Sequence, residues 1–284
     1  MLFRSNAEIV QIYNQLNVVK PLAFVCLTLG LLLFALYVYR FSMQKKPNRI
    51  VRYLSLGGLL LMFIFLSVLI ALRSAIVGYF PLANGYEVMH FLAWTALLLT
   101  LLFYRRFQML LPFGFLLCGF SLLVATMGEA NPQITALKPV LSSPLLSVHV
   151  VVIMFSYALL AFIMLNGLTA ILLHCFSENA QRQIERLKTI SHLMLYPAVF
   201  CLAIGIFVGA IWANLSWGRY WGWDPKEVWA LITLMIYSLA LHTDSLPMFR
   251  KPMFFHLFAV VAFLAVLFTY FGVNFLLGGL HSYA

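Results

Sequence analysis

Long apolar stretches alternate with short polar segments along almost the whole chain. A transmembrane helix needs about 20 predominantly apolar residues, and eight stretches reach this length, one of them marginally. The predicted spans are residues 18–41, 51–77, 86–104, 108–127, 144–175, 192–213, 225–243 and 252–277. The pattern therefore predicts an all-α, polytopic integral membrane protein with about eight transmembrane helices, in which residues 1–284 form a single transmembrane domain.

The polar segments between the predicted spans are too short to form a soluble domain. Residues 1–17 lack the basic start, short apolar core and small-residue cleavage site of a signal peptide, so we expect the first span to be retained. The longest connection, residues 128–143, contains two proline-centred turns. Residues 177–191 place Arg and Lys beside Ile and Leu, which is typical of a short interfacial helix.

Composition excludes a water-soluble enzyme. The chain is 64% apolar and 9% charged, whereas soluble domains are about 45–50% apolar and about 25% charged. The formal net charge is +10. In a membrane protein such an excess bears first on topology and on contacts with membrane lipid, so nucleic acid is not expected as a partner.

Basic residues divide unequally between the two ends of the predicted spans. The connections at one end hold Arg40, Lys45, Lys46, Arg49, Arg52, Arg105, Arg106, Arg182, Arg186, Lys188, Arg250 and Lys251. The other end holds Arg4, Lys20, Arg73, Lys138, Arg219 and Lys226. The positive-inside rule places the more basic end in the cytoplasm, and both termini are then expected outside.

Five of the six tryptophans fall between residues 212 and 229, in WANLSWGRYWGWDPKEVW. The second half of this segment has the pattern of a helix start. Asp224 fits the N-cap position, Pro225 the first helical position and Glu227 the third, which is a capping-box arrangement. The segment is thus predicted to leave the sixth span on the outer side and to re-enter as the seventh.

The tryptophans of this segment admit two interpretations. Indole rings favour the headgroup level, so they could form an ordinary interfacial belt. A belt, however, spreads one or two tryptophans over each helix end, whereas here the rings gather in one loop. The members of this predicted loop are Trp212, Trp217, Tyr220, Trp221 and Trp223, spaced by Gly218 and Gly222. Flat rings with flexible glycine spacing favour binding of a large planar apolar ligand, with Asp224 as helix cap and loop anchor.

The segment WGRYWGWDPKEVWALI resembles the WWD signature of haem-handling membrane proteins of cytochrome c biogenesis. Further segments are similar to the CcsA (ResC-type) family, the multispan subunit of the system II cytochrome c synthase. They are NGYE at 84–87, HVVVIMFSYALLAF at 149–162, LHTD at 241–244 and YFGVNFLLGGLHSYA at 270–284. The resemblance covers roughly the last two hundred residues. The signature alone would also fit CcmC and CcmF, but eight spans and the closing GLHSY favour CcsA.

The resemblance implies a substrate, a reaction and partners. The substrate would be haem b (iron protoporphyrin IX), transported, presented and joined by thioethers to the CXXCH motif of apocytochrome c. The implied cytochrome c synthase (haem lyase) activity would require a CcsB-type membrane partner, separate or fused, with a periplasmic domain. The membrane would be the inner (cytoplasmic) membrane of a bacterium, or the thylakoid membrane of a plastid.

Two histidines are expected level with the tryptophan loop. His149 lies in the second turn of the fifth span, after Pro144, and His281 follows the eighth span. Two imidazoles that face one another can ligate an iron axially, and the resemblance matches both positions to the paired external histidines of the family. We therefore predict that His149 and His281 hold the haem iron during attachment.

His242 is expected near the cytoplasmic end of the seventh span. It follows Asp224 by 18 residues, which is about 27 Å along a helix, so it cannot reach the outer site. An ionisable group in a span is a functional candidate. The resemblance matches His242 to the family's transmembrane haem ligand, whose opposite ligand comes from the CcsB partner.

The remaining histidines and two outer cations have weaker assignments. His90 is expected on the outer side in a structural or supporting role, and His174, His192 and His256 at cytoplasmic span ends in interfacial or phosphate-contacting roles. Arg219 and Lys226 are candidates for pairing the haem propionates, although solvated or lipid-facing charges fit equally. Two rival functions stay open: non-catalytic haem delivery of the CcmC type, and transport of another solute with the histidines as a proton relay. A purely structural subunit is disfavoured by the coincidence of His149, His281 and the tryptophan loop on one face.

Overall fold

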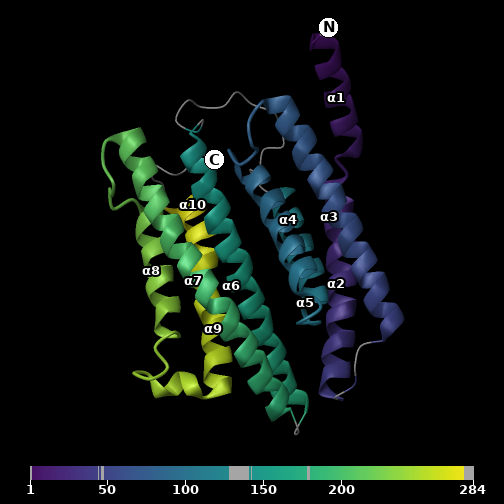
Figure 1. Cartoon of the computed structure of the whole chain (residues 1–284), viewed down its shortest axis with the longest axis vertical. Helices are drawn as coiled ribbons and strands as arrows, with labels where there is room; N and C mark the ends of the chain where they lie inside the picture. Colours follow the sequence, from purple (N-terminus) through teal and green to yellow (C-terminus); the bar gives the residue numbers. More distant parts are fainter. Residues whose placement is uncertain are drawn as a thin grey trace. The chain divides into compact units, whose positions relative to one another are not determined.

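The computed structural model describes residues 2–43, 45, 48–127, 141, 143–177 and 180–277 (Figure 1). His281, the closing GLHSY and almost all of the connection 128–143 lie outside the described residues. The described part of the chain is helical and contains no strand. Its elements are α1 (Leu2–Leu16), α2 (Val19–Ser42), α3 (Arg49–Val77), α4 (Gly85–Phe103), α5 (Leu110–Ala125), α6 (Pro144–Phe176), α7 (Gln181–Trp217), α8 (Pro225–Leu239), η2 (Pro247–Arg250), α9 (Pro252–Leu267), η3 (Phe268–Gly272, π-helical) and α10 (Val273–Leu276).

The helices confirm the predicted all-α, polytopic membrane architecture. Six helical segments are long and apolar enough to cross a membrane: Glu8–Ser42, Arg49–Val77, Gly85–Phe103, Pro144–Phe176, Gln181–Trp217 and Pro252–Gly272. The other two predicted spans are the helices α5 and α8, with 16 and 15 residues. Both are shorter than the length of about 20 residues that a full crossing needs.

Two boundaries differ from the sequence prediction. The segment predicted as a separate interfacial helix is continuous with the sixth span, because α7 runs unbroken from Gln181 to Trp217 and contains Pro197. The polar N-terminal segment is also helical, as α1. In both places helical propensity and packing outweigh the polarity that marked these residues as connections.

Local chemistry sets several helix ends. Asn84 caps α4 because its side chain accepts a hydrogen bond of 3.0 Å from the Glu87 N–H. Asn48 caps α3 in the same way. The α3 helix ends at Gly78 in the left-handed conformation, with φ of 76°, which glycine adopts without the steric cost of a side chain.

Contacts within the chain group the helices into two compact units. The first comprises Met1–Ala35 and Pro47–Ser142, and the second comprises Leu36–Lys46 and Ser143–Ala284. The first therefore holds α1, α3, α4, α5 and most of α2, and the second holds α6 to α10 with the end of α2. The expectation of a single transmembrane domain stays a prediction.

In the first unit, helices α2 and α5 approach at glycines. A Cβ added at Gly119 would lie 2.7 Å from the Leu27 backbone nitrogen, and one at Gly30 would lie 2.9 Å from that of Leu116. Small residues let helix backbones meet in a membrane, where dispersion and close packing replace the hydrophobic effect as the attraction between helices.

In the second unit, α6 and α7 form an extensive antiparallel pair (Figure 1). His149, Ile153 and Ser156 project from one face of α6 because their spacing of four and three residues returns to the same side of a helix. Ile153 packs against Gly205 of α7, and the Ser156 hydroxyl donates to the Ala198 carbonyl at 2.8 Å. This face of α6 brings His149 against α7.

Candidate functional site

The tryptophan-rich segment is only partly a loop. Trp212 and Trp217 belong to the last two turns of α7, and the irregular segment covers only residues 218–224. Gly218 ends α7 with φ of 75°, and its N–H bonds the Asn214 carbonyl at 2.9 Å. The structure thus places two of the four predicted ligand-lining tryptophans on a helix. From here on the name tryptophan loop refers to residues 218–224.

The predicted capping box at the start of α8 is confirmed. The Asp224 side chain accepts from the Lys226 N–H at 3.1 Å. In return, the Glu227 carboxylate accepts from the N–H groups of Gly222 and Asp224 at 2.8 and 3.2 Å. Since Gly222 lies inside the loop, Glu227 fixes the tryptophan loop as well as the helix end.

The four tryptophans form two edge-to-face pairs. Trp212 and Trp217 have ring centroids 4.9 Å apart, and Trp221 and Trp223 have centroids 5.9 Å apart. Trp212 is fully buried, and its ring packs against that of Trp217 at the end of α7. Trp223 is 73% exposed and has φ of 56°, a left-handed conformation that costs a bulky residue about 1–2 kcal/mol. The large apolar ring of Trp223 is therefore exposed on a backbone conformation that is unfavourable for this residue.

The His149 side chain packs against two glycines of α7, Gly205 and Gly209, and we call this contact the His149 seat. Its Nδ1 lies 2.7 Å from the Gly205 carbonyl oxygen. A Cβ added at Gly209 would lie 2.7 Å from both Nδ1 and Cε1 of the same imidazole. Gly205 and Gly209 are one turn apart in the sequence GIFVG, a pattern of small residues that allows close helix packing. The sequence carried this signal, but its link to His149 appears only in the folded chain.

The hydrogen bond to Gly205 assigns a proton to Nδ1 of His149. A backbone carbonyl can only accept, so Nδ1 carries a proton, and in the neutral imidazole the lone pair is then on Nε2. Metal-ligating histidines commonly hold their orientation through such an Nδ1–H bond to a carbonyl. His149 is therefore oriented as an iron ligand would be.

His242 has the same tautomer and a different setting. It follows the end of α8, is exposed, and its Nδ1 lies 2.8 Å from the Ser238 carbonyl oxygen. Nε2 again carries the lone pair. The prediction that His242 ligates haem at a second site stays a prediction, as does the pairing of His149 with His281. Among the described residues no group of three or more His, Cys, Asp or Glu side chains could hold a metal ion.

The two outer cations have unequal surroundings. Lys226 donates from Nζ to the Asn274 side-chain oxygen at 2.8 Å. Arg219 is exposed, and its guanidinium folds over Gly222, where an added Cβ would lie 2.9 Å from Nε. Of the two candidates for pairing a propionate, Arg219 is thus the one at the surface of the loop.

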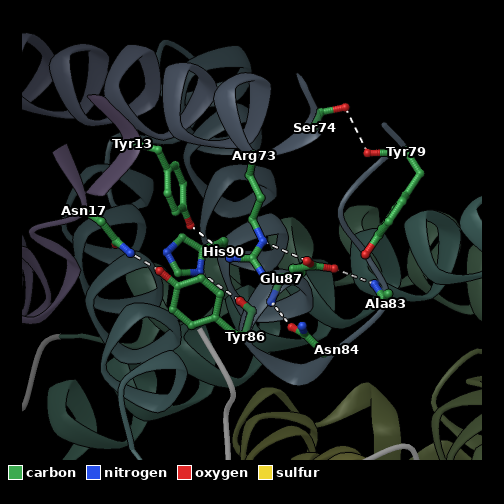
Figure 2. Close-up of polar contacts among 10 residues, drawn as sticks. All are labelled: Tyr13, Asn17, Arg73, Ser74, Tyr79, Ala83, Asn84, Tyr86, Glu87 and His90. Carbon is green, nitrogen blue, oxygen red and sulfur yellow. Dashed lines mark hydrogen bonds and ion pairs between the residues drawn. The ribbon is translucent and has the colours of Figure 1, made fainter. Parts of the chain in front are cut away.

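A buried ion pair in the first unit was not anticipated from the sequence. Arg73 of α3 donates from Nε to Glu87 of α4 at 2.7 Å, with both side chains almost fully buried, and from Nη1 to the Tyr13 hydroxyl at 3.1 Å (Figure 2). The other Glu87 oxygen accepts from the Ala83 N–H at 2.7 Å. The sequence did contain a sign of this pair, since Arg73 and Glu87 are opposite charges at the ends of neighbouring predicted spans. Charged groups within a membrane protein are usually paired.

His90 lies beside this ion pair. Its Nδ1 is 2.8 Å from the Tyr86 carbonyl oxygen, and its ring packs on the Tyr86 ring with centroids 4.2 Å apart (Figure 2). Tyr86 in turn donates to Asn17, which directly follows α1, at 2.9 Å. His90 thus belongs to a polar cluster that joins α1, α3 and α4, which agrees with the structural role expected for it.

The remaining histidines differ from one another in burial. His256 is fully buried and its Nε2 bonds the Ile184 carbonyl at 3.0 Å, which links α9 to α7. His192 stacks on Phe255 with ring centroids 4.6 Å apart, whereas His174 is exposed near the end of α6. The contact of His256 is a packing contact between helices, so an interfacial role fits His174 better than His256.

Known proteins are similar to this chain over most of its length. The profile of the cytochrome c assembly protein family matches residues 82–281. Protein NrfI of Wolinella succinogenes is 37% identical over 279 residues, which is 96% of this chain and 31% of that protein. The cytochrome c biogenesis protein CcsA of Chlamydomonas reinhardtii is 36% identical over 78% of this chain and 65% of its own length. CcsA of Guillardia theta is 32% identical over 89% and 92%.

The family match spans the tryptophan loop and the positions of all three proposed haem ligands. The chain covers about a third of the Wolinella relative, just under two thirds of the Chlamydomonas relative and nearly all of the Guillardia relative. The chain therefore belongs to the cytochrome c assembly protein family, as a CcsA-type member with a role in cytochrome c biogenesis.

Proposed function

We propose that this chain is the haem-transporting and haem-presenting subunit of a cytochrome c synthase. The observation that carries the proposal is the seat of His149, where two glycines of α7 admit the imidazole and a backbone carbonyl fixes its Nε2 as the ligating nitrogen. The His149 seat and the tryptophan loop belong to the same compact unit. A planar apolar ligand with a metal at its centre needs an imidazole to ligate the metal and aromatic rings to contact its face.

In the proposed reaction, haem b is the substrate and apocytochrome c supplies the nucleophiles. The two thiols of its CXXCH motif add to the haem vinyl groups, so the synthase needs no nucleophile of its own. Its contribution is to hold the haem where the thiols can reach it, and correct placement alone accelerates reactions between two molecules by many orders of magnitude. The apocytochrome histidine then replaces one of the two imidazoles, His149 or His281.

The residues of the site have separate roles in this scheme. His149 and His281 ligate the iron, which also limits oxygen access. The exposed Trp223 and its partner Trp221 contact the porphyrin face, while Trp212 and Trp217 support the loop. Arg219 pairs with a propionate, and Asp224 anchors the loop through the helix cap. His242 receives haem at the other end of α8, before transfer to the outer site.

A CcsB-type partner completes the proposal. His242 needs an opposite ligand, and an unfolded apocytochrome needs a docking surface larger than the tryptophan loop. The Wolinella relative has roughly three times the length that matches this chain, which supports a synthase with additional fused or associated parts. We further propose that the tryptophan loop and both termini face the outside of the cytoplasmic membrane, or the equivalent side of a thylakoid membrane.

The decisive experiment is visible spectroscopy of the detergent-purified protein, with and without its partner. Wild type should carry haem with a six-coordinate low-spin spectrum, which His149→Ala and His281→Ala should each convert to a weaker, five-coordinate one. Absence of haem from wild type, or an unchanged spectrum in the double variant, would refute the outer-site assignment. His242→Ala should lower haem occupancy at the outer site without changing the spectrum of the haem that remains.

The same preparations separate attachment from delivery. Incubation with a CXXCH peptide and reductant should yield a peptide with covalently bound haem, detected by mass spectrometry. Release of haem to the peptide without thioether bonds would instead support delivery of the CcmC type. A preparation that moves another solute in response to a proton gradient and holds no haem would support the transporter alternative.

A further inference from the structure

The Arg219 guanidinium lies flat against Gly222 in the tryptophan loop. A Cβ added at Gly222 would lie 2.9 Å from Nε, 3.0 Å from Cζ and 3.1 Å from Nη2 of Arg219. Three atoms of the planar group at nearly equal distances show that it turns its face, and not its edge, to Gly222. The N–H groups of a guanidinium lie in its plane, so they are not directed at Gly222.

The backbone beneath the guanidinium is held in place by α8. The Gly222 N–H donates to the Glu227 carboxylate at 2.8 Å, and Glu227 belongs to the first turn of that helix. Gly222 is not one of the described residues with a positive φ, so its backbone conformation does not require glycine. The three atoms nearest to an added Cβ all belong to Arg219. A glycine at position 222 therefore leaves space for the guanidinium.

The positive charge of Arg219 is not neutralised by a carboxylate of the described chain. No ion pair among the described residues includes Arg219. The nearby acidic side chains, Asp224 and Glu227, accept hydrogen bonds from backbone N–H groups of the loop and of the helix start. Arg219 is exposed, and a guanidinium offers its N–H donors in a rigid fork that matches the two oxygens of a carboxylate. The side chain is therefore suited to an acidic ligand at the loop surface.

We propose that Arg219, positioned by Gly222, makes the tryptophan loop specific for porphyrins that carry free carboxylates. The inference rests on the proposed function and refines it, since haem b carries its two propionates on one edge of an otherwise apolar plane. Trp221 and Trp223 flank Gly222 in the sequence, so the aromatic rings and the guanidinium meet within three residues. Aromatic rings do not distinguish a porphyrin acid from its ester, whereas a guanidinium does. Arg219 thus determines specificity, and Gly222 is a positioning residue.

The test uses metal-free protoporphyrin IX and its dimethyl ester, to which histidine ligation of a metal contributes nothing. Binding to the detergent-purified protein is followed by quenching of tryptophan fluorescence. Comparing variants at one detergent concentration cancels partitioning of the porphyrins into micelles. The ratio of acid to ester affinity should fall roughly tenfold from wild type to Arg219→Gln, the lower end for a hydrogen bond to a charged group, because the loop is exposed. Arg219→Lys should keep part of the preference, because an amine retains the charge without the fork.

Gly222→Ala tests whether the glycine positions the guanidinium. The new methyl group takes the place of the guanidinium, which can move aside because it ends a flexible side chain. The acid-to-ester ratio should fall roughly three- to tenfold, while the affinity for the ester and the unfolding temperature stay those of the control Gly57→Ala, whose Cβ has no neighbour within 4 Å. In an Arg219→Gln background, Gly222→Ala should cause no additional loss. A further loss there would overturn the positioning role.

The outcomes separate this inference from the proposed function. Saturable binding of both porphyrins with the same acid-to-ester ratio in wild type and Arg219→Gln would refute the specificity and leave haem binding intact. If Arg219 instead contacts a lipid phosphate, Arg219→Gln should purify with less anionic phospholipid at an unchanged porphyrin ratio, which would also refute the proposal. Absence of saturable binding of either porphyrin to wild type would overturn both the specificity and the proposed function.

Discussion

Replacing Gly209 by alanine should displace the His149 imidazole without weakening α7. The added Cβ would lie 2.7 Å from both Nδ1 and Cε1. Carbon atoms in ordinary contact are at least 3.4 Å apart, so the ring must retreat by about 0.7 Å. The retreat stretches the 2.7 Å hydrogen bond to the Gly205 carbonyl, which fixes the orientation of the ring.

The magnitudes separate an effect on function from an effect on stability. Overpacking costs about 1–3 kcal/mol, whereas alanine favours a helix over glycine by about 1 kcal/mol. The free energy of unfolding should therefore fall by no more than about 2 kcal/mol. A displacement approaching 1 Å at a reacting centre can reduce a rate about 100-fold. We expect haem attachment to fall at least tenfold while the protein stays folded.

The assay is the rate of thioether formation on a CXXCH peptide, together with the low-spin fraction of bound haem. Gly57→Ala is the matched control, because Gly57 also lies within a long apolar helix and an added Cβ there has no neighbour within 4 Å. If Gly209→Ala attaches haem within about twofold of Gly57→Ala, the glycine seat does not position His149 and the reasoning is wrong.

Three further substitutions test the loop and the buried ion pair. Trp223→Gly should keep or raise the unfolding temperature, because glycine relieves the left-handed backbone, yet should reduce haem retention severalfold in the Soret band; a parallel loss of stability would contradict this. Glu227→Ala removes the acceptor of two loop N–H groups and should cost about 1–2 kcal/mol, seen as a lower unfolding temperature and red-shifted tryptophan emission. Glu87→Ala leaves Arg73 buried without its carboxylate and should cost about 3–5 kcal/mol. The paired change Arg73→Met with Glu87→Leu should recover most of that loss in detergent unfolding, and a double variant as unstable as Glu87→Ala would argue against the ion pair as the cause.

The sequence by itself determined the features that depend on neighbouring residues. Long apolar runs located the helices, because the cost of exposing backbone polar groups to lipid leaves few alternatives to a helix. The capping box of Asp224 and Glu227 was predictable because its partners are three residues apart and its geometry is local. The aromatic clustering and the family resemblance together indicated cytochrome c biogenesis.

The tertiary structure alone decided which side chains meet across helices. His149 and Gly205 are 56 residues apart, and Lys226 and Asn274 are 48 apart. Such contacts depend on how closely two backbones approach, which a one-dimensional pattern does not contain. Trp212 is a second example of what the sequence could not show. The sequence grouped it with the loop, but α7 continues for another turn and the Trp212 ring is buried. Local sequence thus specified the helices and their caps, while packing between helices determined how His149 is oriented and which tryptophan rings remain exposed.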